Sequence, residues 1–262
     1  MYNLTTKEEH MFSLSPWSHP DSPIFVKELS DDAYMKVPLF RQVERLLQLC
    51  STKNGIKLTP RGMLPLRVVR EVYELGVKDS LSEWYDRLSE EKCAPVILTR
   101  LILTGTGLAR KYNGYLVATK QGRSMLEGPV RDFLNIVLQY LTRDFDMGYF
   151  DGYRNIPAFN SSYCFLIMSF GKWGDTLRGV DFYKDKIIEC DEMWAAAALE
   201  NSYASYDRLT SCLSVRFFKR YLGFLGLAQI ENESFTDPGK VVKTPLFDEL
   251  IGFTHPLETF GE

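Results

Sequence analysis

Residues 212–228 read Cys212-Leu213-Ser214-Val215-Arg216-Phe217-Phe218-Lys219-Arg220-Tyr221-Leu222-Gly223-Phe224-Leu225-Gly226-Leu227-Ala228, and residues 240–244 read Lys240-Val241-Val242-Lys243-Thr244. Apolar residues recur in the first stretch at i, i+3, i+7 and i+10, which predicts one buried face of a helix; they are Val215, Phe218, Leu222 and Leu225. Gly226 predicts the end of this helix, because a glycine just past the last apolar position can adopt a left-handed turn. The Val241-Val242 pair follows a loop rich in turn-forming residues and predicts a strand. The segment Ser211–Leu250 is therefore interpreted as the amphipathic helix and the hairpin of a winged helix.

Cationic residues fall on the other side of the same predicted helix. Arg216, Lys219 and Arg220 follow one another at i, i+3 and i+4, roughly opposite the apolar face. Such a face can lie against phosphates or enter a major groove, and Lys240 and Lys243 would add phosphate contacts from the hairpin. The alternative is the solvated face of an ordinary surface helix, since a helix-turn-helix fold does not by itself imply DNA binding.

An earlier part of the chain repeats the pattern. Gly107-Leu108-Ala109 matches Gly226-Leu227-Ala228, and each tripeptide follows an apolar helical run. The Asn113-Gly114 dipeptide predicts a hairpin turn between two short strands. This repetition predicts a second copy of the helix–hairpin–helix plan, with coincidence between small apolar tripeptides as the alternative. The equivalent cations of this first copy are Arg110, Lys111 and Lys120.

The predicted fold class is mainly α with small β-hairpins, arranged as tandem winged-helix-like modules. An irregular N-terminal arm is expected over residues 1–36, where Pro16, Pro20 and Pro23 interrupt any long helix. A first winged-helix-like module is expected over 37–128, and a second over 176–262. Linking helices are expected between them, over 129–175, because an apolar stripe runs through residues 129–142.

One short segment resembles a known group of proteins. The segment Leu58-Thr59-x-x-Gly62-x-Leu64-Pro65, followed by Arg67-Val68-Val69, is similar to a stretch of poorly characterised bacterial proteins, some of which also carry plasmid-type or SEC-C-type segments. The resemblance covers a small part of the chain. It implies a bacterial origin, and it supplies no catalytic residues.

Composition limits the class of protein. The 262 residues fit one large domain or two modest ones, and the formal charge of −3 neither requires nor excludes a nucleic-acid partner. Five widely spaced cysteines, with no C-x-x-C pair, indicate free thiols in a reducing compartment. No apolar run is long enough for a membrane span and no secretory signal is recognised, so a cytoplasmic location without a membrane partner is expected.

No pattern of catalytic, cofactor-binding or metal-binding residues is recognised. Asp144, Asp146 and Asp151 form an acidic cluster that could offer oxygen ligands to Mg²⁺ or Ca²⁺, but glycines at the wrong offsets and the lack of a closing Glu depart from the EF-hand pattern. A solvated turn whose aspartates cap neighbouring helices is the preferred interpretation. The chain is accordingly expected not to be an enzyme and to need neither metal nor cofactor.

Two functional hypotheses follow. The first is a nucleic-acid-binding or regulatory winged-helix protein whose partner is DNA. The second is a protein–protein interaction or scaffold module of the same fold that binds no DNA. Loop aromatic residues favour the second, because exposed aromatic clusters can mark interfaces; they are Tyr149, Phe150 and Tyr153.

Overall fold

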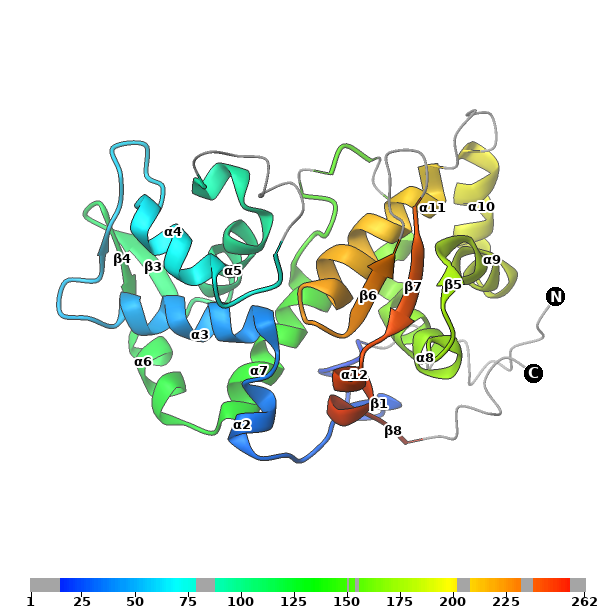
Figure 1. Ribbon diagram of the computed structural model, residues 1–262, viewed down its shortest axis with the longest axis horizontal. Coiled ribbons are helices and arrows are strands. Elements are labelled where there is room, and N and C mark those ends of the chain that lie inside the picture. The colour runs from blue at the N-terminus through cyan, green and yellow to red at the C-terminus, as the bar shows by residue number, and fades with distance from the viewer. Residues whose placement is uncertain are drawn as a thin grey trace. The chain divides into compact units, whose positions relative to one another are not determined.

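The computed structural model of the chain describes residues 15–78, 88–149, 151–153, 156–201, 208–231 and 238–254. They form two compact units. The N-terminal unit comprises Glu28–Tyr140 with Phe224–Gly226, and the C-terminal unit comprises Leu141–Gly223 and Leu227–Glu262 with Met1–Lys27. Both contain several helices and a three-stranded antiparallel sheet, which confirms the predicted mainly α fold with small hairpins (Figure 1).

The N-terminal unit alternates helices with short strands. Its long helices α3 and α5 pack against each other, and their buried side chains form the centre of its core. Strand β4 lies between β2 and β3, and both neighbours are antiparallel to it. The elements are α2 (Asp31–Tyr34), α3 (Pro38–Cys50), β2 (Ile56–Lys57), α4 (Leu66–Tyr73), a short 3-10 helix (Glu90–Lys92), α5 (Ala94–Gly105), β3 (Ala109–Tyr112), β4 (Tyr115–Ala118), α6 (Lys120–Glu127) and α7 (Val130–Gln139).

The hairpin between β3 and β4 follows from its turn residues. Asn113 has φ 46° and Gly114 has φ 78°, the left-handed conformations that a tight two-residue hairpin turn requires. Leu116 and Ala118 of β4 are buried. Because side chains alternate along a strand, the residues between them point to the opposite, outer face of the sheet.

The segment 58–65 is held by a buried ion pair. The Leu64 N–H donates to a Glu90 carboxylate oxygen at 2.6 Å, and the Arg100 guanidinium contacts both oxygens of that carboxylate at 2.9 Å. Arg100 also donates to the Gly62 carbonyl at 3.0 Å. Glu90 is 5% exposed. This conformation depends on two side chains that come from later in the chain.

The C-terminal unit has a core rich in aromatic residues. Phe170 contacts the rings of Tyr183, Phe218 and Phe247 with centroids 5.4–5.8 Å apart, mostly edge to face. Its sheet has the strand order β5–β7–β6, and β1 pairs with β8 in a separate two-stranded sheet. The elements are β1 (Ile24–Val26), a π-helix η3 (Tyr140–Asp144, beginning at the last residue of the other unit), a 3-10 helix (Pro157–Ser162), α8 (Tyr163–Trp173), β5 (Arg178–Gly179), α9 (Val180–Cys190), α10 (Glu192–Asn201), α11 (Arg208–Leu213), a π-helix η5 (Ser214–Gly223), β6 (Ala228–Glu231), β7 (Lys240–Lys243), α12 (Pro245–Leu250) and β8 (Ile251–Phe253).

The two units repeat one order of elements. Each has a helix, a short strand, further helices, two hairpin strands and a final helix, and in each sheet the last strand lies in the middle. The glycines that precede the hairpins adopt the same conformation, with φ 73° at Gly107 and 74° at Gly226. The closing threonines make matching bonds, since the N–H of Thr119 donates to Leu108 and that of Thr244 to Leu227.

The boundaries of the units differ from the predicted ones. The predicted linking segment 129–175 is divided at residue 140, so that α7 belongs to the N-terminal unit and α8 to the C-terminal unit. The predicted arm 1–36 is divided as well, because β1 pairs with β8 whereas α2 packs on α7. Pairing with distant residues decides both divisions. Within the described ranges, no helix is long and apolar enough to cross a membrane.

Candidate nucleic-acid interface

Arg216, the first cation of the predicted basic face, is buried. It is 2% exposed, and its Nε lies 2.5 Å from Oδ2 of Asp151, whose side chain is 1% exposed. A second guanidinium nitrogen donates to the other Asp151 oxygen at 3.2 Å and to the Tyr153 carbonyl at 3.3 Å. The expectation that Arg216 faces solvent and contacts phosphates is therefore wrong.

The buried surroundings of this helix explain the correction. Ser214–Gly223 is a π-helix and not the α-helix that the prediction assumed. The predicted apolar positions Phe218 and Leu222 are buried, and the side that carries Arg216 is covered as well, because it packs against the buried Asp151 carboxylate. Arg216 is accordingly buried together with Phe217, Phe218, Tyr221 and Leu222.

The other predicted cations of this unit are mostly engaged. Arg220 is half-buried and donates to the carbonyls of Met147 and Tyr149 at 2.9 and 2.6 Å. The Lys243 side chain is only 6% exposed and lies 3.1 and 2.9 Å from carboxylate oxygens of Asp175 and Asp248, so it is not the exposed phosphate contact that was predicted. Lys219 is half-buried, and Lys240 is exposed.

The acidic cluster at 144–151 is structural as far as its contacts are described. Asp151 neutralises Arg216, Asp146 accepts the Gly148 N–H at 2.8 Å, and Asp144 pairs with the neighbouring Arg143 at 2.9 Å. Over the described parts of the chain, no group of three His, Cys, Asp or Glu side chains is arranged to hold a metal ion. Of these three aspartates, Asp151 is the one that neutralises a cation of the predicted basic helix.

The aromatic residues of the same loop do not form one exposed cluster. Tyr149 is 42% exposed, Tyr153 is half-buried, and Phe150 lies outside the described residues. The Tyr149 ring contacts Phe145 at 6.3 Å between centroids. These positions give little support to an interface at this loop.

The N-terminal unit presents its cations differently. Arg110, Lys111 and Lys120 are exposed, as are Lys57 and Arg67, which the sequence analysis did not select. Within the described residues, none of these five makes an ion pair with a carboxylate. The Lys111 side chain extends to the 58–65 segment. Its ammonium nitrogen Nζ would lie 3.0 Å from a Cβ atom added to Gly62. These five exposed cations lie on β2, β3 and the starts of α4 and α6.

The distribution of basic and acidic residues along the sequence predicts this surface. Residues 45–70 contain six Lys and Arg and no Asp or Glu, and residues 92–126 again contain six and none. The N-terminal unit has 17 basic against 13 acidic residues, and the C-terminal unit has 14 against 21, which gives formal charges of +4 and −7. The nearly neutral whole chain conceals this asymmetry.

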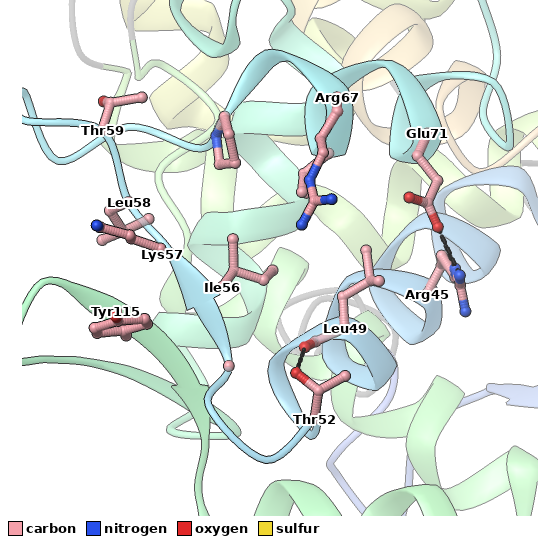
Figure 2. Close-up of a pocket in the computed structure, with 13 residues that line it drawn as sticks. Arg45, Leu49, Thr52, Ile56, Lys57, Leu58, Thr59, Arg67, Glu71 and Tyr115 are labelled. Atoms are coloured by element: carbon pink, nitrogen blue, oxygen red, sulfur yellow. Dashed lines mark hydrogen bonds and ion pairs between the residues drawn. The ribbon is translucent and has the colours of Figure 1, made fainter.

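A pocket of about 540 Å³ lies beside strand β2. Its walls come from the end of α3, the following turn, β2, the start of α4 and Tyr115 of β4. Figure 2 shows Arg67 pointing from α4 into the pocket, and the ion pair of Arg45 and Glu71 closing one side of it. Lys57 and Tyr115 lie next to each other on the other side. The pocket thus combines an unneutralised guanidinium with an aromatic ring and apolar walls.

The helix before the hairpin carries no comparable charge. Within Ala94–Gly105, Arg100 is the one cation in the sequence, and it is bound to Glu90 and Gly62. Its other exposed or half-exposed residues, such as Leu101 and Thr104, are uncharged. This helix therefore offers no basic face to a phosphate backbone.

The five cysteines are free thiols, and the surroundings of four of them raise the thiol pKa. Burial raises the pKa of Cys50, Cys164 and Cys212 to about 12 each. Cys190 is half-buried, and burial followed by the charge of Glu189 raises its pKa to about 11. Because the thiolate is the reactive form, none of these four resembles a catalytic nucleophile.

Thiol modification should reflect these surroundings. At pH 8 we expect the folded protein to react with a disulfide reagent much more slowly than an unstructured cysteine peptide, with Cys190 as the first site. The same reagent should modify all five cysteines rapidly after unfolding in denaturant. Mass spectrometry of the modified peptides gives the order, and rapid labelling of Cys50 or Cys164 in the folded protein would contradict the expectation.

Part of the N-terminal unit matches a known protein family. A family model described as the Y4jL N-terminal domain matches residues 35–131, which lie within the N-terminal unit and make up less than half of the chain. No curated protein and no solved structure matches the chain.

Proposed function

We propose that this protein is a nucleic-acid-binding or regulatory protein built from two winged-helix-like modules. The element order supports this interpretation, because helix, strand, two helices and a hairpin, with the last strand central in the sheet, is the plan of a winged helix. In the N-terminal unit these elements are α3, β2, α4, α5, β3 and β4. In the C-terminal unit α10 is an additional helix within the same plan.

The N-terminal unit makes the contact with phosphates in this proposal. The observation that carries it is the group of exposed cations without acidic partners on the hairpin and beside it, at Lys57, Arg67, Arg110, Lys111 and Lys120. Phosphate contacts dominate the affinity of proteins for nucleic acids, and basic side chains supply them. The C-terminal unit, with its formal charge of −7 and its engaged arginines, contributes less.

Replacement of Arg110 and Lys111 by alanine tests this proposal. Fluorescence anisotropy with labelled DNA, at several salt concentrations, should show affinity reduced by about tenfold or more, because two counterion-releasing contacts are lost. The slope of log K against log salt should fall by about 1 for each residue removed. The matched control replaces Arg208 and Lys240, two exposed cations of the C-terminal unit, and should change the affinity little.

Two outcomes would overturn the proposal. If the unaltered protein binds neither duplex DNA nor single-stranded DNA or RNA at low ionic strength, the nucleic-acid function is wrong. If both pairs of substitutions weaken binding equally, the assignment of the contact to the N-terminal unit is wrong.

A further inference from the structure

The outer face of the N-terminal sheet aligns cations with aromatic rings. Lys57 of β2 pairs with Tyr115 of β4, and Tyr115 pairs with Tyr112 of β3, so these three side chains share one face. Arg110 lies two residues before Tyr112 on the same strand and therefore on the same face. The opposite face carries the buried residues Ile56 and Leu116.

Two rings on this face are accessible. Tyr112 is 56% exposed, an unusual exposure for so large an apolar surface, and Tyr115 is half-buried. The Arg110 guanidinium lies 5.4 Å from the centre of the Tyr112 ring, so the cation and the ring form one contact surface. Acidic residues are missing from this part of the sequence, which makes the face complementary to a polyanion.

We propose that this face binds a single-stranded polynucleotide, with bases stacked on Tyr112 and Tyr115 and phosphates on Arg110 and Lys57. The inference rests on the proposed nucleic-acid function and names the form of nucleic acid. Successive bases of a single strand expose their faces to aromatic side chains, whereas bases in a duplex stack on each other. A protein that recognises duplex DNA would instead need a helix with a polar or basic face for the major groove. The α5 helix has no such face available, because its one cation, Arg100, is bound to Glu90.

The pocket beside β2 extends this face. Lys57 and Tyr115 line it as well, and Figure 2 shows them at the side opposite the ion pair of Arg45 and Glu71. Its volume of about 540 Å³ is within the range of small-ligand sites, so it can take a nucleotide of the bound strand. Arg67 then supplies a third phosphate contact, because a guanidinium matches the geometry of phosphate oxygens.

Affinity measurements with oligonucleotides test the inference. The probes are about 16 nucleotides long, which is an upper site size for a compact single-strand-binding domain. Single-stranded DNA and RNA of one sequence and the corresponding duplex DNA serve as probes, and we expect either single strand to bind at least about tenfold more tightly than the duplex. The stronger of the two single strands identifies the natural sugar. Tyr112→Ala should weaken single-strand binding about tenfold, while Tyr112→Phe, which keeps the ring, should restore it to within about twofold.

The matched control is Tyr149→Ala, which removes an exposed tyrosine from the C-terminal unit and should leave binding unchanged. Two outcomes overturn this inference alone and leave the nucleic-acid function standing. One is tighter binding of the duplex than of the single strands. The other is normal single-strand binding by Tyr112→Ala when the variant without Arg110 and Lys111 is impaired. Equal competition by polyglutamate also overturns it, because a peptide polyanion cannot stack bases. Absence of binding to every probe overturns both proposals.

Discussion

Replacement of Arg216 by alanine is expected to lower the free energy of unfolding of the C-terminal unit by about 3–5 kcal/mol. The guanidinium neutralises Asp151 where neither side chain is more than 3% exposed, so its removal leaves a buried carboxylate without a counter-charge. It also removes a hydrogen bond to the Tyr153 carbonyl. Denaturant unfolding followed by tryptophan fluorescence measures the loss, since three of the four tryptophans, Trp17, Trp173 and Trp194, belong to this unit.

Arg143→Ala is the matched control for this experiment. Arg143 also pairs with an aspartate, Asp144, but the two side chains are 56% and 44% exposed. Exposed pairs contribute about 0–1 kcal/mol, so the control should remain close to the unaltered protein. A combined replacement of Arg216 and Asp151 by apolar residues should recover part of the stability. Equal, small effects of Arg216→Ala and Arg143→Ala would show that Arg216 is not buried as described.

Replacement of Glu90 by alanine is expected to lower the stability of the N-terminal unit by about 2–4 kcal/mol. The carboxylate accepts the Leu64 N–H and binds Arg100, which holds the Gly62 carbonyl in turn. Without it, a backbone donor and an 18%-exposed guanidinium lose their partner. Hydrogen exchange of the amides in 58–65, together with thermal unfolding, should show local loss of protection as well as lower global stability.

The adjacent residue provides the control. Glu91 pairs with Arg61, but these side chains are 43% and 77% exposed, so Glu91→Ala should change stability by less than about 1 kcal/mol. Glu90→Gln keeps an oxygen acceptor and loses the charge, so its effect should lie between the two. Unchanged exchange of the Leu64 amide in Glu90→Ala would contradict the role given to this carboxylate.

Local sequence patterns predicted the elements better than the contacts between them. Asn113, Gly114 and Gly226 adopt positive φ angles, which Asn and Gly tolerate better than other residues. The hairpin and the end of the helix could therefore be predicted from neighbouring residues alone. The burial of Arg216 could not be predicted, because it depends on Asp151, which is distant in the sequence. A helical period predicts which face carries apolar residues, and it does not show whether other elements cover the opposite face.

The candidate site shows the same division. Arg110, Lys111 and Lys120 were predicted to be phosphate contacts, as the equivalents of the cations in the C-terminal repeat. They are exposed, as such contacts require, and their role in binding stays a prediction. Helical periodicity does not predict Lys57 and Arg67, whereas the absence of acidic residues from 45–70 marks both. The pocket depends on how α3, β2 and α4 pack, which no single stretch of sequence encodes.

The pairing of β1 with β8 has a consequence for synthesis on the ribosome. Ile24–Val26 are translated more than two hundred residues before their partner strand Ile251–Phe253. The small sheet therefore cannot close until the residues up to Phe253 have left the exit tunnel. Most of the N-terminal unit is the continuous stretch Glu28–Tyr140, which leaves the tunnel long before Phe253. Its remaining part is Phe224–Gly226, where the Phe224 carbonyl accepts the Leu39 N–H. During translation the N-terminal unit can therefore be completed before the sheet of β1 and β8 closes.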